Sequence, residues 1–196
     1  MANPNVGMMY PVFAKITTHT DGSMPTYAAG VVIQEARNAT ITKTYNDNPL
    51  YGDDRIVDDD NGLLSMTCSF EPTGLSDSDR KLLFDEDEIA AGGLTCQAES
   101  DNETPYGGFG YIRKMRLNGT KKFEAWIILK IKFTEESQAT ATKEGSISWG
   151  TPTLNGRAAG LYIDSSDKQR WRIHETFDTI AAAKSWINTV LNVSTQ

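Results

Sequence analysis

The side chains best suited to catalysis are two histidines, His19 and His174, and two cysteines, Cys68 and Cys96. Neither histidine lies in a motif of a nucleophilic enzyme, and two histidines cannot form a three-histidine zinc site. The cysteines lack the spacing of metal ligands and are too few for a disulfide framework. Cys68 falls on the apolar face of a predicted strand, which is typical of a small buried hydrophobic residue. We therefore expect no catalytic centre, no metal site and no cofactor, and a protein that is not an enzyme.

Carboxylates are the other groups that could do chemistry, and the fragment DDDNG at 58–62 superficially resembles a calcium loop. An EF-hand loop needs an acidic first ligand before its central glycine and a bidentate glutamate at its end. Counting from Gly62 puts Val57 at the first position and Cys68 at the last. The fragment is therefore not an EF-hand, and only a loose calcium or magnesium site among the aspartates stays open.

The glycine-rich segment 107–110 (GGFG) is the remaining candidate for a ligand loop. It has no third spaced glycine and no Lys-Ser or Lys-Thr pair, so it is not a phosphate-binding loop. Flexibility or a close approach to another part of the backbone explains such glycines better.

Charge is distributed unevenly along the chain, whose formal net charge is −7 and whose isoelectric point is near 4.9. Residues 47–60 carry six acids and one base, residues 85–103 carry seven acids and no base, and residues 111–143 carry eight bases and three acids. A net acidic chain disfavours nucleic-acid binding as the primary activity. The segregation reflects either a solvated surface or head-to-tail self-association, in which an acidic loop meets a basic face of the next copy.

Residues 45–62, which are rich in aspartate, form a long connection between two segments. These segments, at 40–44 and 64–70, both show two-residue periodicity. The second segment places Leu64, Met66, Cys68 and Phe70 on one apolar face. The connection is too long for an ordinary hairpin and too apolar for a solvated linker, so we predict that it docks on another subunit. The candidate interface residues are Tyr45, Pro49, Leu50, Tyr51, Asp53, Asp54, Arg55, Ile56 and Val57, with Arg113, Lys114 and Arg116 on the basic segment.

The alternating patterns predict a mainly β fold, a β-sandwich or barrel of antiparallel strands. A short helix is expected near 76–84 with Ser76 as its cap, and a C-terminal helix near 177–191 with Thr176 as its cap. The apolar stripe of the second helix is expected to face the core. An Asn-Gly pair at 118–119 predicts a hairpin, and the run 125–129 predicts a central strand covered on both faces. Further strands are expected at 10–18, 27–35, 94–98, 139–149, 154–163 and 168–173.

These elements divide the chain into an N-terminal arm (1–9), a β-sandwich domain (10–175) that contains the long loop, and a C-terminal helix and tail (176–196). No apolar run approaches the length of a membrane span, so no membrane association is expected. The first residues show neither a basic leader nor a signal-peptide block, so we expect synthesis and folding in the cytoplasm.

Several features follow one another along the chain in a characteristic order. A short arm precedes YPVFAKITTHTDG, and a strand enters the Tyr- and Asp-containing loop TYNDNPLYGDDRIVDDDNG. The return strand LLSMTCSFEP leads directly to the helix SDSDRKLLF, followed by the hairpin YGGFGYIRKMRLNGTKKFEAWIILKIKF and the run ATATKEGSISWGTPTL. In this order of features the chain resembles the major tail tube proteins of long-tailed, non-contractile (siphovirus-type) bacteriophages. The resemblance covers roughly residues 8–165, and the C-terminal helix is less typical of the family.

The resemblance implies a structural virion protein that forms hexameric rings, stacked into a hollow tail tube through which DNA passes during ejection. The long loop would reach a neighbouring subunit, and the N-terminal arm would brace the next ring. An acidic lumen would let double-stranded DNA slide without specific binding. The implied partners are further copies of the chain and the tail terminator, tape measure and distal tail proteins, and the implied location is the phage tail, after synthesis in a bacterial host.

Two alternatives remain from the sequence. One is another stacking ring protein, such as a tail terminator or the tube of a phage-derived bacteriocin. The other is a β-sandwich adhesin or carbohydrate-binding module. Such a module would use Trp126, Trp149, Trp171 and Trp186, although these residues are better explained by core packing.

Overall fold

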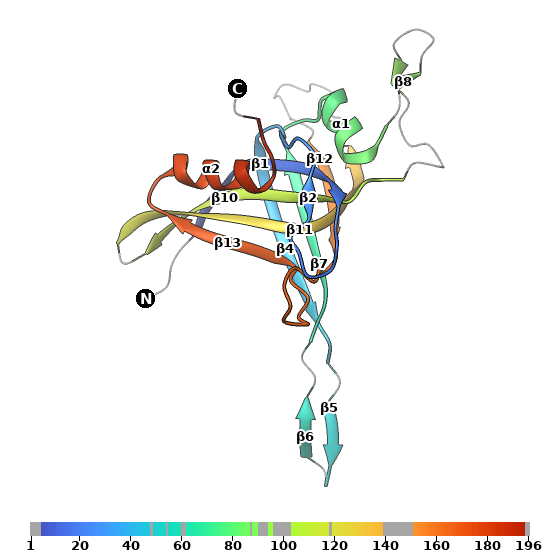
Figure 1. Ribbon diagram of the computed structural model, residues 1–196, viewed down its shortest axis with the longest axis vertical. Coiled ribbons are helices and arrows are strands. Elements are labelled where there is room, and N and C mark those ends of the chain that lie inside the picture. The colour runs from blue at the N-terminus through green and yellow to red at the C-terminus, as the bar shows by residue number, and fades with distance from the viewer. Residues whose placement is uncertain are drawn as a thin grey trace, which may run out of the picture.

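The computed structural model describes residues 5–47, 49–53, 55–59, 62–86, 88–89, 94–95, 103–117, 119–138 and 151–194. It confirms the predicted mainly β fold, an antiparallel sheet accompanied by two short helices in the part of the chain that is described (Figure 1). The helices are α1 (Asp77–Phe84) and α2 (Ile180–Val190).

Nine strands form the main sheet, in the path β2-β1-β10-β11-β12-β7-β4, with β13 paired to β11 and β3 paired to β1. Each pairing in this sheet is antiparallel. Two further ladders, β5-β6 and β8-β9, stand apart from it. The strands are β1 (Asn5–Thr18), β2 (Thr26–Tyr27), β3 (Val31–Val32), β4 (Ala36–Tyr45), β5 (Pro49–Gly52), β6 (Arg55–Asp59), β7 (Leu63–Pro72), β8 (Glu88–Ile89), β9 (Leu94–Thr95), β10 (Gly107–Leu117), β11 (Thr120–Gln138), β12 (Pro152–Ala158) and β13 (Arg172–Phe177).

The main sheet curls around an aromatic core. Ala39 and Ile41 of β4, at one end of the path, pack against the same buried cluster as Phe13 of β1, near the other end. Phe109 lies at the centre of this cluster, with its ring 5.2 Å from those of both Phe70 and Phe133. The curled sheet therefore has the barrel-like form expected from its alternating strands.

Helix α1 closes one end of this core, where Leu83 and Phe84 are buried. The sequence predicted Ser76 as its cap, and the structure confirms it. The Asp79 amide donates to Ser76 Oγ and the Ser76 amide donates to Asp79 Oδ2, which completes a capping box.

Strand β11 is covered on both faces, as the run 125–129 predicts. Trp126 and Ile128 belong to the aromatic core, whereas Ala125 and Ile127 belong to a second buried cluster on the opposite face. Helix α2 covers that second face, where its stripe residues Ala183, Ile187 and Leu191 are buried. The two clusters lie on opposite sides of β11 because successive side chains of a strand alternate between its faces.

The glycines of β10 allow α2 to approach the sheet closely. A Cβ on Gly108 would stand 2.6 Å from the ring of Tyr27, and one on Gly110 would stand 2.9 Å from Leu191. At these two positions the close neighbours are side chains, whereas a Cβ on Gly107 would stand 2.6 Å from the Ala14 carbonyl oxygen, the close approach to backbone that the sequence left open.

Two details of the C-terminal helix and its neighbouring strand differ from expectation. Thr176 is not the cap of α2; Thr179 is, and its side chain accepts from the Ala182 amide. The reason is that Thr176 and Phe177 are held in β13 by pairing with Glu124 and Phe123 of β11. The strand predicted at 168–173 is accordingly displaced to Arg172–Phe177.

Other strand boundaries also differ. The strand expected at 27–35 is split into β2 and β3, with Gly30 bridged to Val193 after α2. Residues 5–9, expected in an arm, belong to β1, where Asn5 pairs with Met115. The turn between β10 and β11 lies where the Asn-Gly pair predicts, with Gly119 at a φ of 82°, although Asn118 itself lies outside the described residues, as does the predicted strand at 139–149.

Candidate subunit interface

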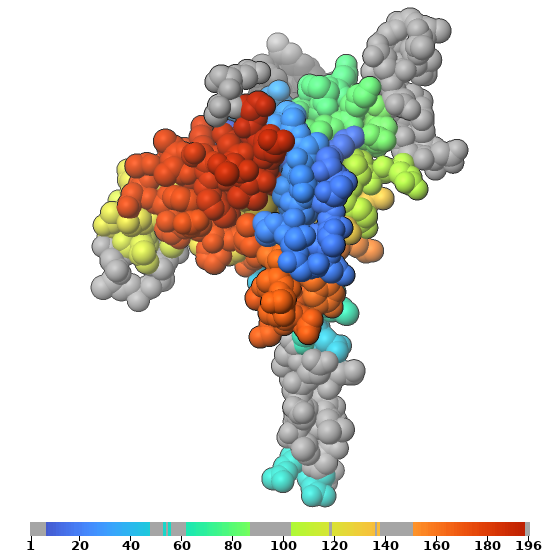
Figure 2. Space-filling view, viewed as in Figure 1, coloured from blue at the N-terminus to red at the C-terminus, as the bar shows by residue number. Residues whose placement is uncertain are grey.

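An extension built from β4, β7, β5 and β6 projects from the barrel (Figures 1 and 2). Strands β4 and β7 pair from Ala36 and Pro72 outward to Tyr45 and Leu63. The Asn46 amide then donates to the Gly62 carbonyl at 2.7 Å. Beyond this point β5 and β6 form a separate two-stranded ladder. The tip of this ladder stands clear of the rest of the molecule in both views.

Side chains at the root of the extension are exposed although they are apolar. Leu64 was expected on the buried face with Met66, but it is 64% exposed, whereas Met66 is fully buried. The alternation along β7 is correct, but the strand has left the core by Leu64, so the described part of the chain leaves this side chain largely uncovered. Tyr45, on the neighbouring strand, is 51% exposed. The root therefore offers apolar surface that the described residues of its own chain do not cover.

The structure places most of the predicted interface residues of the loop in this extension. Asp53, with a φ of 50°, and Arg55 are exposed at its tip, and Asp54 lies outside the described residues. The ladder pairs the remaining residues by backbone register, Pro49 with Asp59, Leu50 with Asp58, Tyr51 with Ile56 and Gly52 with Arg55, and Val57 lies within β6.

The three basic residues predicted on β10 do not form one patch. Lys114 and Arg116 are exposed and follow Ile112 at two-residue spacing, on the face that α2 covers further along the strand. Arg113 points to the opposite face with Tyr111, which belongs to the aromatic core. The structure therefore separates Arg113 from the other two.

Arg113 instead lines a groove between four strands, which we call the arginine groove. Its volume is about 390 Å³. Arg37 of β4 and Arg172 of β13 line it together with Arg113 and Tyr111 of β10. The other lining residues are Gly7, Met8, Asn38, Ala39 and Ile41. Three arginines that are far apart in sequence thus line one hollow.

A buried carboxylate holds one of these arginines. Arg113 Nε donates to Glu124 Oε2 at 2.5 Å, and Glu124 is only 7% exposed. Burial alone would raise the pKa of Glu124, but the hydrogen bond from Arg113 and the nearby positive charges outweigh it and lower the pKa. His174 Nε2 lies 3.9 Å from the other carboxylate oxygen. Glu124 is therefore ionised and forms an ion pair with Arg113.

An aromatic stack positions the second arginine. The rings of Trp126 and His174 are stacked at 4.2 Å with an interplanar angle of 13°. Arg172 Cζ lies 4.0 Å from the Trp126 ring centroid, and Arg113 Cζ lies 5.0 Å from it. Such cation–π contacts fix the guanidinium planes without neutralising their charge.

The groove carries an excess of positive charge. Among the described residues, Arg113 forms an ion pair with a carboxylate, whereas Arg37 and Arg172 form none. In the described part of the chain, Arg37 donates a long hydrogen bond of 3.4 Å to Thr151 Oγ1. Sequence reasoning missed Arg37 and Arg172 because the curl of the sheet, which brings β4 and β13 beside β10, leaves no local signal.

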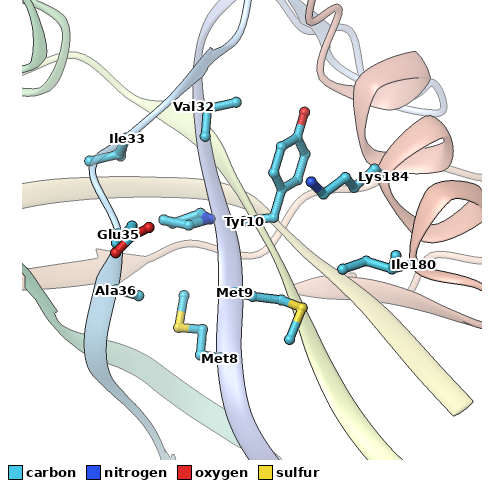
Figure 3. A pocket seen from close by; sticks show the side chains of 10 residues that line it. Met8, Met9, Tyr10, Val32, Ile33, Glu35, Ala36, Ile180 and Lys184 are labelled. Carbon is cyan, nitrogen blue, oxygen red and sulfur yellow. The ribbon is translucent and has the colours of Figure 1, made fainter. Parts of the chain in front are cut away.

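A second hollow lies between β1, β3 and α2 and has a volume of about 380 Å³ (Figure 3). Met8, Met9 and Val32 line it, and Tyr10 lies beside Lys184, whose Nζ is 4.6 Å from the tyrosine ring. The Tyr10 hydroxyl donates to Asn188 Oδ1 at 2.8 Å. These contacts tie α2 to the bulge in β1 and bring together no nucleophile and base.

A third hollow, of about 530 Å³, lies on the outer face of β11 and β12. Lys130 and Lys132 approach the ring of Tyr106 at 4.6 and 5.6 Å, and Arg157 is exposed nearby. This face is basic as well, but its lysines lie over an aromatic ring rather than around a buried carboxylate.

Candidate catalytic and metal-binding groups are not assembled in the described part of the chain. Within it, no group of three or more His, Cys, Asp or Glu side chains is placed to hold a metal ion. Cys68 is a free, buried thiol whose pKa is raised to about 12 by burial. Cys96 lies outside the described residues.

The tryptophans that the structure describes take part in packing. Trp126 is buried, and Trp171 and Trp186 are half-buried against the two core clusters. Trp149 lies outside the described residues. Neither described helix is long and apolar enough to cross a membrane.

A scan against models of protein families finds none that matches this chain. A search of curated proteins also finds no match. The function must therefore be argued from the geometry of the extension and the grooves.

Proposed function

We propose that this protein is a structural virion protein, a tail tube subunit of a long-tailed bacteriophage. It polymerises as hexameric rings that stack into the hollow tube through which the genome is ejected. The subunit acts without a catalytic centre or a cofactor. Its partners are other copies of the chain and, at the two ends of the tube, the tail terminator, tape measure and distal tail proteins.

The observation that carries this proposal is the extension. It places the β5-β6 ladder beyond the barrel, and at its root Tyr45 and Leu64 are more than half exposed in the described part of the chain. Ordering such a projection costs conformational entropy, and contacts with another subunit recover that cost. An arm that reaches a neighbouring subunit is what a stacked assembly needs.

The edges of the sheet also support an assembly of many copies. Strand β4 lies at the end of the sheet path, and β13 pairs with β11 alone among the described strands. Open edges of this kind are templates for pairing with another chain. Pairing between copies would build a continuous barrel around a channel, with the curled sheet of each subunit as one part.

Deleting residues 47–60 tests the proposal in the full-length protein. Because the deletion removes the ladder and leaves the barrel, we expect a folded monomer with unchanged circular dichroism. We expect the wild type to form tubes in negative-stain electron microscopy and the variant to form none. Wild-type-like tubes from the variant, or a wild type that never forms rings or tubes, would contradict it. Single unstacked rings from the wild type would indicate a terminator-type ring protein instead.

A further inference from the structure

We propose that the arginine groove is the binding site for aspartate side chains of the extension of a second copy of this chain. The inference rests on the proposed function only in requiring that copies associate. It does not depend on the number of subunits in a ring or on the stacking of rings into a tube.

The groove is built to bind carboxylates. Arg37, Arg113 and Arg172 line it, and among the described residues only Arg113 of these three is paired with a carboxylate, that of the buried Glu124. Guanidinium groups bind carboxylates through paired, parallel hydrogen bonds. Arg113 and Arg172 are half-buried, so an incoming carboxylate would lie in surroundings of lower polarity than water, where the attraction is stronger.

The floor of the groove adds a neutral hydrogen-bond donor. Tyr111 lines the groove and is buried, and burial raises its pKa to about 12. Its hydroxyl group is therefore protonated at neutral pH and can donate a hydrogen bond to a carboxylate. The stack of Trp126 on His174 holds Arg172 before binding, so little side-chain freedom is lost when the ligand arrives.

The extension supplies the matching charge. Residues 47–60 carry six aspartates and one arginine, and Asp53 is exposed where the chain turns between β5 and β6. An exposed carboxylate at the tip of a projecting ladder is accessible to a second copy and complements the charge of the arginines.

The occupant must come from another copy. Asp53 is separated along β4 and β5 from Ala39, which lines the groove, by mostly extended chain. At about 3.3 Å per residue this chain places the tip on the order of 40 Å from the groove of its own subunit. The ladder projects away from the barrel (Figure 1). Its tip therefore does not reach the arginines of its own subunit.

The experiment measures self-association of the full-length protein by sedimentation velocity and negative-stain microscopy at low and at physiological salt. Two charge reversals, Arg37→Glu and Arg172→Glu, are made in the groove. Arg157→Glu, on the outer face of β12, is the matched control, because it changes the same charge at an exposed position outside the groove. A fourth variant combines Arg172→Glu with Asp58→Arg and Asp59→Arg, which reverses the charge on both sides of the contact.

We expect each groove variant to weaken association at least tenfold, the control to change it less than twofold, and the combined chain to recover at least part of the loss. Arg37 is exposed at the rim of the groove, so Arg37→Glu tests the proposal even where Arg172→Glu impairs folding. Association of both groove variants like the wild type overturns the inference. An equal loss in Arg157→Glu, or no recovery in the combined chain, overturns it as well.

The two proposals fail in different ways. If the groove variants form normal tubes, the tail tube proposal stands, and the groove is not the contact between its subunits. Wild-type dimers or chains that depend on the groove but never form rings support the groove contact and contradict the tail tube. A wild type that stays monomeric at every concentration contradicts both.

Discussion

Leu191, just beyond α2, packs against Gly110 of β10 so closely that a Cβ on the glycine would stand 2.9 Å from Leu191 Cδ1. Ile187 Cγ2 would be 3.0 Å from the same Cβ. Gly110→Ala therefore forces the buried side chains of Leu191 and Ile187 to shift, and we expect it to lower the free energy of unfolding by about 1–3 kcal/mol. Urea unfolding followed by tryptophan fluorescence measures the difference.

Gly74→Ala is the matched control for this substitution. A Cβ on Gly74 meets nothing within 4 Å, and the residue has no positive φ, so the change should leave the free energy of unfolding within about 0.5 kcal/mol of the wild type. An equal loss at both glycines would show that backbone freedom, rather than packing of α2, sets the cost at Gly110.

How much the sequence predicts depends on how local the cause is. The Ser76 cap and the doubly covered run 125–129 follow from neighbouring residues alone, and the structure has both. The cap of α2 was misplaced because pairing of Thr176 with β11, a contact between distant segments, overrides its local preference for a cap.

Part of the candidate interface can likewise be predicted from the sequence, and part cannot. The long connection at 45–62 was visible in the sequence because both flanking strands alternate and the loop does not fit a hairpin. Arg37 and Arg172 were not visible, since they meet Arg113 only through the curl of the sheet. Leu64 has the right alternation for a buried residue, but where a strand leaves the core depends on the whole fold.

Glu86 should make stability depend on pH in the direction opposite to most carboxylates. It is 4% exposed and lies 3.6 Å from Arg80, which is already held by two hydrogen bonds to Glu135. Burial raises the pKa of Glu86 more than the charge of Arg80 lowers it. The folded state thus binds this proton more tightly than the unfolded state. The resulting stabilisation is complete below the unfolded pKa and is lost as the pH rises through the folded pKa.

Glu86→Gln removes this dependence. We expect the free energy of unfolding of the variant to increase relative to that of the wild type as the pH is raised from 4 to 8, in urea titrations at each pH. A difference between the two proteins that stays constant over this range would mean that the pKa of Glu86 is the same in the folded and unfolded states.

Glu124 should make stability depend on pH in the direction that is usual for carboxylates. Its pKa is lowered despite its burial, because Arg113 donates to it and positive charges surround it. The stabilisation is present above the unfolded pKa and is lost as the pH falls through the lowered folded pKa. Glu124→Gln should therefore cost about 1–2 kcal/mol at pH 7, and the cost should shrink in acid. Urea titrations from pH 3 to pH 7 test this, and a cost that grows in acid would contradict it.

Tyr45 and Leu64 at the root of the extension should affect assembly without affecting the fold. Both are more than half exposed, so Tyr45→Ser and Leu64→Ser remove little that the isolated subunit buries, and the melting temperature should stay within a few degrees of the wild type. If a second subunit covers these side chains, each substitution loses roughly 1.5–3 kcal/mol of apolar burial, which is about a tenfold or larger loss of association.

Leu117→Ser, at the turn between β10 and β11, is the matched control, because Leu117 is also exposed but lies away from the extension. Sedimentation velocity compares the three variants. Association that falls equally in all three would mean that general surface hydrophobicity drives it, whereas a loss confined to Tyr45 and Leu64 assigns the contact to the extension.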